Sequence, residues 1–367
     1  MTVYAHINTV PNGSTGGIMM KEHRELLAAG EESYAFWGRG RAGEGDRELR
    51  FATDGEVRLD ALQTRLDGKA GFHSKAATRR LLERLDEIKP DVVHLHNLHG
   101  YYVNIEMLFE WLAAHDCKVE WTLHDCWAFT GHCAYFTYVK CDKWKAGCGN
   151  GCPQLSTYPK THSKASCAWN FDQKRRLFNL VPAGRMKLIT PSQWLANLVG
   201  ESFLSKYPVE VRHNTIDTSV FKPTPSDFRE RYGIGDRFVI LGVASPWTER
   251  KGLSDFVRLA GELDSEKYAI VLVGLSEKQV KEMPAGIVGL ARTDSREELA
   301  GIYSTADVFF NPTVEDNYPT VNLEAEACGT PVVTYDTGGC REAIFRSDSR
   351  VVVGFESAVS RIKELAA

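Results

Sequence analysis

The residues with the clearest chemical potential lie within 311–333, where an acidic loop precedes a predicted helix. An apolar run before this stretch predicts a strand, the helix should begin near Thr320, and Gly329-Thr330-Pro331 should end it. In open α/β sheets, ligands bind where strands end and helices begin. Amide groups at such a helix N-terminus can bind a phosphate, and the carboxylates of Asp316 and Glu324 can accept hydrogen bonds from sugar hydroxyls.

A basic pair, Arg250-Lys251, follows another predicted strand end and precedes Gly252. Two fixed cations can neutralise a diphosphate and stabilise it as a leaving group, which otherwise requires a metal ion. An isolated Arg-Lys pair is more commonly part of a solvated loop, so its interpretation depends on the acidic stretch. The sequence has no Asp-x-Asp motif to hold a divalent ion, and Asp316-Asn317 is the nearest approach. We therefore expect that catalysis requires no cofactor.

The first half of the chain has candidates of its own. Gly16-Gly17 lies in a predicted turn between the first strand and a helix expected from Ile18, and glycine lets a backbone come close to a ligand. His124-Asp125 stands at the end of another predicted strand. His94 and His96 would share one face of a short apolar strand, either as metal ligands or, more commonly, as buried core residues.

Cysteines are concentrated in one segment: six of the nine lie from Cys126 to Cys167. Four of these have seven, six and three residues between successive members: Cys133, Cys141, Cys148 and Cys152. Zinc sites made of four cysteines usually show two short pairs, and only the last two residues make one here. Structural zinc, free or packing thiols, and disulfides all remain open from this spacing.

The composition bounds the class of protein. A chain of 367 residues that is 43% hydrophobic and 25% charged is long enough for two domains with real cores. We find no apolar run of the length that a membrane helix needs and no signal-peptide pattern, so a cytoplasmic location is expected. The net charge of −4 argues against nucleic acid as a partner.

Short apolar runs alternate with helical patterns in both halves, which predicts parallel sheets covered on both faces. We expect two doubly wound domains, 1–218 and 219–367, with five strands in the second. Residues 39–70 show no clear pattern and are interpreted as a loop with some helix. Residues 126–168 interrupt the alternation and are interpreted as a Cys-rich functional insertion in the first domain.

The acidic stretch resembles the signature of the retaining family 4 glycosyltransferases. That signature is an acidic residue, seven further residues, Glu-Ala and then Gly-x-Pro-Val, and Asp316, Glu324-Ala325 and residues 328–333 correspond to it. The resemblance implies the GT-B fold, in which two Rossmann-like domains face each other across a cleft. It also implies that Glu324 binds the donor ribose and that Asp316, with Glu315 as its alternative, contacts the transferred sugar.

The resemblance extends over nearly the whole chain. Lys251 matches the family lysine that binds the donor diphosphate, and Arg250 is expected to replace the family arginine, which is absent. Gly16-Gly17 matches a glycine turn of the donor site, and His124 matches a strand-end histidine that contacts the transferred sugar. The signature loop adds four expected donor-binding residues: Asn317, Tyr318, Pro319 and Thr320.

The run from His124 to Gly131, together with the Cys-rich loop, resembles a branch associated with capsule, colanic acid and exopolysaccharide assembly. It implies transfer of a sugar, with retention, from a UDP- or GDP-sugar to a saccharide or lipid-linked saccharide. Peripheral contact with the inner face of the membrane stays open. Two alternatives remain: a non-catalytic scaffold that binds nucleotide sugars, and a nucleotide-sugar epimerase on the same fold.

Overall fold

The computed structural model describes residues 1–41, 45–149 and 151–367. The chain forms two compact units, Met1–Arg212 and His213–Ala367. Residues 212–227 join the last strand of the first unit to the first helix of the second and contain neither helix nor strand. The expected boundary at residue 218 falls within this connecting segment, a few residues after the division at Arg212.

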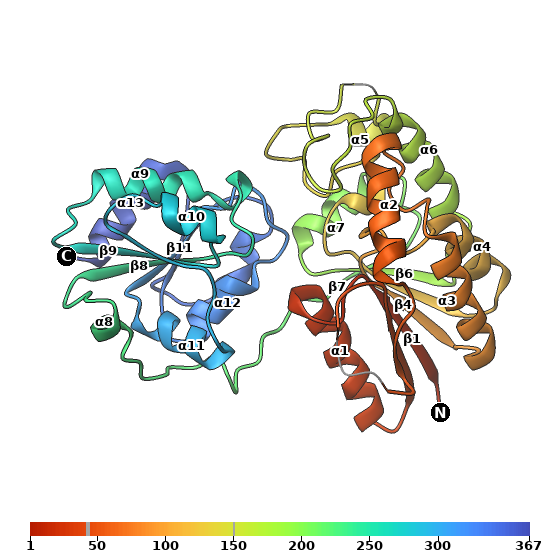
Figure 1. Cartoon of the computed structure of the whole chain (residues 1–367), viewed down its shortest axis with the longest axis horizontal. Coiled ribbons are helices and arrows are strands. Elements are labelled where there is room, and N and C mark those ends of the chain that lie inside the picture. The colour runs from red at the N-terminus through yellow and green to blue at the C-terminus, as the bar shows by residue number, and fades with distance from the viewer. Residues whose placement is uncertain (42–44, 150) are drawn as a thin grey trace. The chain divides into compact units, whose positions relative to one another are not determined.

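Within its described residues, the first unit contains one sheet of seven parallel strands (Figure 1). These are β1 (Val3–Asn8), β2 (Glu32–Trp37), β3 (Glu48–Arg50), β4 (Val92–Leu95), β5 (Lys118–Thr122), β6 (Met186–Thr190) and β7 (Val209–Val211). Their order in the sheet is β3-β2-β1-β4-β5-β6-β7. The central strand β4 is buried along its whole length, as expected for a parallel sheet that helices cover on both faces.

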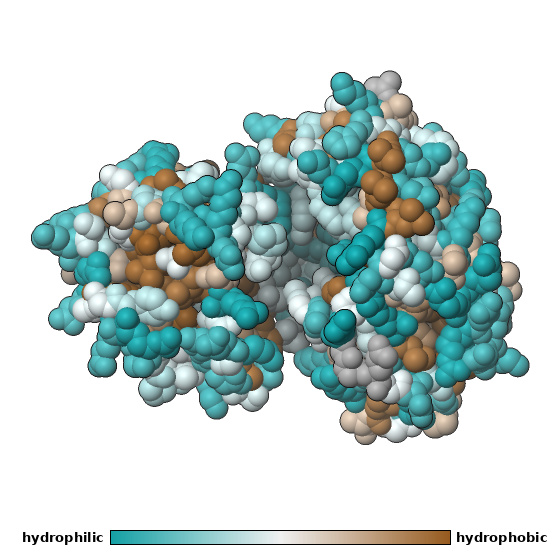
Figure 2. All heavy atoms as spheres, in the orientation of Figure 1, coloured by the Kyte–Doolittle hydropathy of each residue, from teal (hydrophilic) through white to brown (hydrophobic). Residues whose placement is uncertain are grey.

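Six helices of at least two turns surround this sheet among the described residues: α1 (Gly13–Ala28), α2 (Asp54–Asp67), α3 (Lys75–Ile88), α4 (Ile105–Ala114), α6 (Ser166–Phe178) and α7 (Gln193–Gly200). Residues 39–70 were expected to be a loop with some helix. The helix is α2, which is longer than expected, and the strand β3 was not predicted. Thr53 and Glu56 cap α2 reciprocally at its start. Three leucines on α2, at positions 59, 62 and 66, are more than half exposed, and Figure 2 shows a brown strip where Figure 1 draws this helix.

The Cys-rich insertion is packed against the first unit rather than extended from it. It contains a single 3₁₀ turn, η1 (Trp127–Phe129), and a short helix, α5 (Lys143–Ala146), within its described part. The side chains of Trp127, Phe129, Phe136 and Trp144 are buried in the same apolar cluster as the sheet and α4. Burial of large aromatic side chains contributes much of the stability of such a segment.

The second unit, all of whose residues are described, contains a sheet of six parallel strands. These are β8 (Phe238–Val243), β9 (Tyr268–Val273), β10 (Ile287–Leu290), β11 (Val308–Asn311), β12 (Val332–Tyr335) and β13 (Arg350–Val352), in the order β10-β9-β8-β11-β12-β13. The expectation of five strands is wrong, because the sheet has six. The strand that was not predicted is the edge strand β13, which has too few residues (three) to show a pattern.

The helices of the second unit are α8 (Phe228–Arg231), α9 (Leu253–Glu262), α10 (Glu277–Glu282), α11 (Arg296–Thr305), α12 (Thr320–Ala327) and α13 (Gly354–Leu365). Two apolar clusters enclose its sheet, one including α9 and α13 and the other α11 and α12. The unit is therefore a doubly wound α/β domain, as expected. Among the described residues of the whole chain, none of the helices has the length and apolar character to cross a bilayer.

Candidate active site

The acidic stretch lies at the carboxyl end of β11, which is flanked in the sheet by β8 and β12. The loop leaves β11 at Asn311 and enters α12 at Thr320, so the predicted strand, loop and helix are all present. The loop is not a solvated surface segment, because Thr313 and Glu315 are fully buried and Asp316 is only 9% exposed. A buried acidic loop requires partners for its charges.

Those partners come from the β8–α9 connection, through the 3₁₀ turn η2 (Glu249–Lys251). The ammonium group of Lys251 forms an ion pair with Asp316 Oδ2, and Arg250 Nη1 lies 3.9 Å from the same oxygen. Arg250 also donates to the backbone oxygen of Glu315. Burial alone would raise the pKa of Asp316, but Lys251 and Arg250 outweigh burial and lower it.

Backbone contacts fix the two loops against each other and against the segment after β12. Val314 N donates to the backbone oxygen of Arg250 over 2.9 Å, and Gly339 N donates to that of Asp316 over 2.9 Å. At Gly338, φ is +57°, and a Cβ built there would lie 1.9 Å from the backbone oxygen of Asp316. Gly338 is thus needed to hold Asp316, a role that the sequence does not reveal because it depends on contact between distant loops.

Glu324 lies in the second turn of α12. Tyr303 of α11 donates its hydroxyl to Glu324 Oε2 over 3.0 Å, and burial raises the pKa of this carboxyl group. Tyr303 is a site residue that sequence reasoning missed, since nothing local distinguishes it from any other buried aromatic. The role of Glu324 in binding ribose stays a prediction.

The remaining residues of the signature loop take separate positions. Tyr318 stacks on His213 with ring centroids 4.8 Å apart, and burial raises its pKa to about 12. Pro319 occupies the N-cap position of α12, where it has no side-chain group to satisfy the first amides, and Thr320 is the first helical residue. Asn317 is buried and donates its backbone amide to Asp316 Oδ1 over 2.9 Å.

In the first unit, His124 and Asp125 lie just after the end of β5, with Leu123 between the strand and His124. His124 Nε2 lies 3.2 Å from His96 Nδ1, and burial lowers the pKa of His124 to about 4. The imidazole is therefore neutral at pH 7 and suits a hydrogen bond to a hydroxyl better than general acid catalysis. Asp125 Oδ2 pairs with His99 Nε2 at 2.7 Å, and these residues line a hollow of about 190 Å³. His99 was missed by sequence reasoning.

The predicted glycine turn at Gly16-Gly17 is wrong as a local structure. Helix α1 begins at Gly13, so both glycines lie inside its first two turns. A Cβ on Gly16 would lie 2.5 Å from the backbone carbon of Pro11, whereas one on Gly17 would meet nothing within 4 Å. A glycine is required at position 16 because the preceding loop folds back over the start of the helix. Donor binding by Gly16 or Gly17 remains a prediction.

The four predicted zinc ligands, Cys133, Cys141, Cys148 and Cys152, line one pocket of about 320 Å³. None of the nine cysteines, all of which are described, forms a disulfide. The structure adds Cys167 of α6 to this set. Hydrogen bonds from Cys133 and Cys167 hold the pKa of Cys152 far below its usual value, and Gly131 N donates to Cys148 Sγ over 3.1 Å. Cys167 is the last of the six cysteines of this segment, and its position in the first turn of α6, which the spacing does not show, brings it to the pocket.

Comparison with known proteins shows which families this chain resembles. The sequence model of the family "Glycosyl transferases group 1" matches residues 237–366, most of the second unit. A provisionally named colanic acid biosynthesis glycosyl transferase of Escherichia coli K12, WcaC, is 26% identical over 372 residues, covering 93% of this chain and 84% of the relative.

Solved structures resemble the chain over its whole length. Sucrose-phosphate synthase from Thermosynechococcus elongatus superposes with a TM-score of 0.73 at 14% identity, covering 100% of this chain and 90% of that structure. Anabaena HepE, solved in complex with UDP-glucose, gives a TM-score of 0.61 at 14% identity, covering 100% and 94%. These structures define the GT-B fold for this chain. The family match, the relative and the fold together support a family 4-like glycosyltransferase of this fold.

Proposed function

We propose that this enzyme transfers a sugar from a nucleotide diphosphate sugar to a saccharide or lipid-linked saccharide, with retention at the anomeric carbon, in surface polysaccharide assembly. The polysaccharide context is supported by the similarity to WcaC, whose name places it in colanic acid biosynthesis. The use of a UDP-sugar is supported by the HepE structure, which holds UDP-glucose. GDP-sugars remain the other donor class to test.

One observation carries the proposal: two cations and a carboxylate meet where β8 and β11 end, beside the N-terminus of α12. Arg250 and Lys251 can neutralise the diphosphate as its bond to the sugar breaks. Asp316, held against Lys251, can accept a hydrogen bond from a hydroxyl of the transferred sugar. Glu324 can accept hydrogen bonds from the ribose hydroxyls.

In the proposed reaction the new glycosidic bond forms on the face from which the nucleotide diphosphate departs. The acceptor hydroxyl gives its proton to the leaving phosphate, so no protein nucleophile is assigned. The chain's residues act by binding and by electrostatic stabilisation of the departing diphosphate. The neutral imidazole of His124 would orient the sugar by a hydrogen bond.

A donor panel tests this function. Purified protein is incubated with UDP-, GDP-, ADP- and TDP-sugars, and release of nucleotide diphosphate and retention of stereochemistry are measured. We expect turnover with one nucleotide class. A thermal shift with a donor but no turnover, with or without saccharide acceptors, would instead support the scaffold alternative, and epimerised nucleotide sugar would support the epimerase. Liposome flotation tests peripheral membrane contact.

We also propose a structural zinc ion in the cysteine pocket, now with Cys167 as a fifth candidate sulfur beside Cys133, Cys141, Cys148 and Cys152. The convergence of buried thiols on Cys152 supports it, and the ammonium group of Lys174, which donates to the backbone oxygens of Trp127 and Thr130, can offset the charge of zinc-bound thiolates. Elemental analysis should find a zinc ion that Cys148→Ser loses and Cys117→Ser retains. Substoichiometric metal in the purified protein, together with pocket thiols that alkylate freely in the native state, would contradict it.

A further inference from the structure

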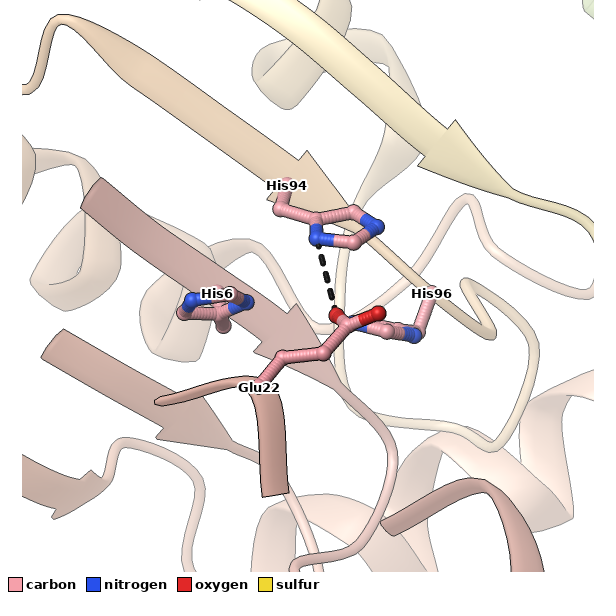
Figure 3. Close-up of side chains that lie close together, drawn as sticks. All are labelled: His6, Glu22, His94 and His96. Atoms are coloured by element: carbon pink, nitrogen blue, oxygen red, sulfur yellow. Dashed lines mark ion pairs between the residues drawn. The ribbon is translucent and has the colours of Figure 1, made fainter. Parts of the chain in front are cut away.

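Three histidines and a glutamate gather on one face of the first unit's sheet (Figure 3). His6 belongs to β1, His94 to β4, His96 directly follows β4, and Glu22 reaches over from α1. One ligand atom from each residue lies within 4.8 Å of all the others. Nothing proposed above for sugar transfer uses this group.

The topology of the sheet creates the group. Strands β1 and β4 are parallel neighbours, and His6 is the register partner of His94. His94 and His96 point to the same face because they are two residues apart, and their rings stack with centroids 4.3 Å apart. Helix α1 packs on β1 and brings the carboxylate of Glu22 to the imidazoles.

Two of the rings are held in a fixed orientation by hydrogen bonds on their far side. His94 Nε2 lies 2.8 Å from Thr122 Oγ1, and His96 Nδ1 lies 3.2 Å from His124 Nε2. Each ring therefore turns its other nitrogen inward: His94 Nδ1 is 3.2 Å and His96 Nε2 is 3.8 Å from Glu22 Oε2. Metal-bound histidines are oriented in this way by partners on the nitrogen that does not bind the metal.

Three of the nitrogens in this group lack hydrogen-bond partners among the described residues. Both ring nitrogens of His6 and Nε2 of His96 are buried without one. His6 and His96 are each 1% exposed, so water does not readily satisfy them. A buried polar atom without a partner costs about 1–3 kcal/mol. Several such atoms aimed at one point indicate an occupant that accepts their lone pairs.

The chemistry of the four side chains favours a cation as that occupant. Imidazole nitrogens carry lone pairs and a carboxylate oxygen carries negative charge, so both bind metal ions. The group offers one imidazole nitrogen from each of three histidines and one carboxylate oxygen.

We propose that His6, Glu22, His94 and His96 bind a divalent first-row transition-metal ion, with Zn²⁺ as the favoured occupant. Imidazole nitrogens with one carboxylate oxygen are a donor set that zinc accepts in four-coordinate sites. Metal on His96 Nε2 leaves the proton on Nδ1, whose N–H then donates to His124 Nε2. The ion thus acts as a positioning element for His124. Only this last consequence rests on the proposed sugar transfer.

Metal binding is tested on the full-length protein without any activity assay. Protein stripped with a chelator is titrated with Zn²⁺ alone, in the wild type and in Cys148→Ser, which separates this site from the cysteine pocket. We expect one tightly bound equivalent to persist in Cys148→Ser. Co²⁺ in its place should give the ligand-field absorption of a four-coordinate nitrogen and oxygen site without thiolate charge-transfer bands.

Variants decide whether these residues hold the ion. In the Cys148→Ser background, Glu22→Gln and His96→Gln should each weaken Zn²⁺ binding by at least about ten-fold. His23→Gln is the matched control, since His23 is a buried histidine of α1 whose Nδ1 pairs with Ser33 Oγ at 2.8 Å. If His96→Gln does not fold, Glu22→Gln decides, because its side chain is 24% exposed. Absence of metal binding in Cys148→Ser, or binding that both variants retain, would overturn the proposal.

Discussion

The two sheets of this protein have the same parallel architecture but different chemistry where their strands end. In the second unit, the ends of β8 and β11 bring together two basic side chains and a carboxylate, those of Arg250, Lys251 and Asp316. In the first unit, the ends of β1, β4 and β5 bring together histidines that burial keeps neutral. One edge is suited to a phosphate anion and the other to a metal ion or a neutral hydroxyl.

This comparison shows that sheet topology sets where a ligand can bind, whereas the residue types at that place set which ligand binds there. Strand ends in an open α/β sheet always converge on one edge, where loops leave space for a ligand. Fixed cations there stabilise a diphosphate leaving group without a metal. Neutral imidazoles there donate lone pairs and cannot balance an anion's charge. Each of the following predictions is a way to break or sharpen this contrast.

The largest effect should come from Lys251→Ala, which removes the cation that contacts Asp316. We expect sugar transfer to fall by about 10²–10³-fold, the range for loss of one preorganised group that stabilises developing charge. Initial rates with the preferred donor measure it. Lys278→Ala, in which an 82% exposed side chain of the same unit is removed, is the control. A variant that is folded and nearly as active as wild type would remove the diphosphate role of Lys251.

Glu324→Gln should have the next largest effect. The neutral amide keeps the shape but loses charge-assisted acceptance from ribose, so donor binding should weaken by about 1.5–3 kcal/mol. Isothermal titration with the donor measures this, and Glu356→Gln, whose side chain is 76% exposed, is the control. Unchanged donor affinity would show that Glu324 has another role.

Gly16→Ala tests whether a first-unit glycine serves packing. A new Cβ only 2.5 Å from the backbone of Pro11 should lower the free energy of unfolding by about 1–3 kcal/mol, whereas Gly17→Ala, with open space around its Cβ, should not destabilise. Thermal or chemical denaturation measures both. If Gly17→Ala lost donor affinity while remaining stable, the ligand contact predicted for this pair would be supported instead.

The pH dependence of donor affinity should be modest and should depend on Glu324. Its pKa is raised by burial, and ribose binding needs the ionised carboxylate. Affinity should therefore be full above this raised pKa and decline as the pH falls through it, beginning at a higher pH than for an ordinary glutamate. Donor titrations at several pH values should show a flatter profile for Glu324→Gln. Identical profiles would assign the decline to another group.

The smallest effect is expected from chelation. Turnover should persist in EDTA over short assays, because Arg250, Lys251 and the start of α12 replace a divalent ion at the diphosphate. The zinc ions proposed for the first unit would be buried. EDTA should therefore remove them slowly and without an immediate effect on donor binding. Activity that EDTA abolishes at once and that added Mg²⁺ or Mn²⁺ restores would overturn the metal-free assignment of the second unit.

Local sequence patterns predicted the strands whose side chains are buried along most of their length. Two of the five strands expected in the second domain, Phe238–Val243 and Tyr268–Val273, are apolar runs with few interruptions, because a parallel strand that is buried on both faces has apolar residues along its length. Helix α2 was expected only as some helix within residues 39–70. Leu59, Leu62 and Leu66 share one helical face, but this face is exposed, so their spacing does not mark a helix that faces the core. Its reciprocal cap between Thr53 and Glu56 was the local signal available.

The sequence by itself indicated the class of the enzyme through its resemblance to the family 4 signature, since Asp316, Glu324, the following Gly-Thr-Pro turn and Lys251 can be recognised along single segments. Only the tertiary structure decided that Lys251 pairs with Asp316, that Tyr303 holds Glu324, that Cys167 joins the cysteine pocket, and that His6 and Glu22 join His94 and His96. The reason is physical: contacts between distant segments are set by strand order and register, and by which helix covers which face, rather than by spacing along the chain.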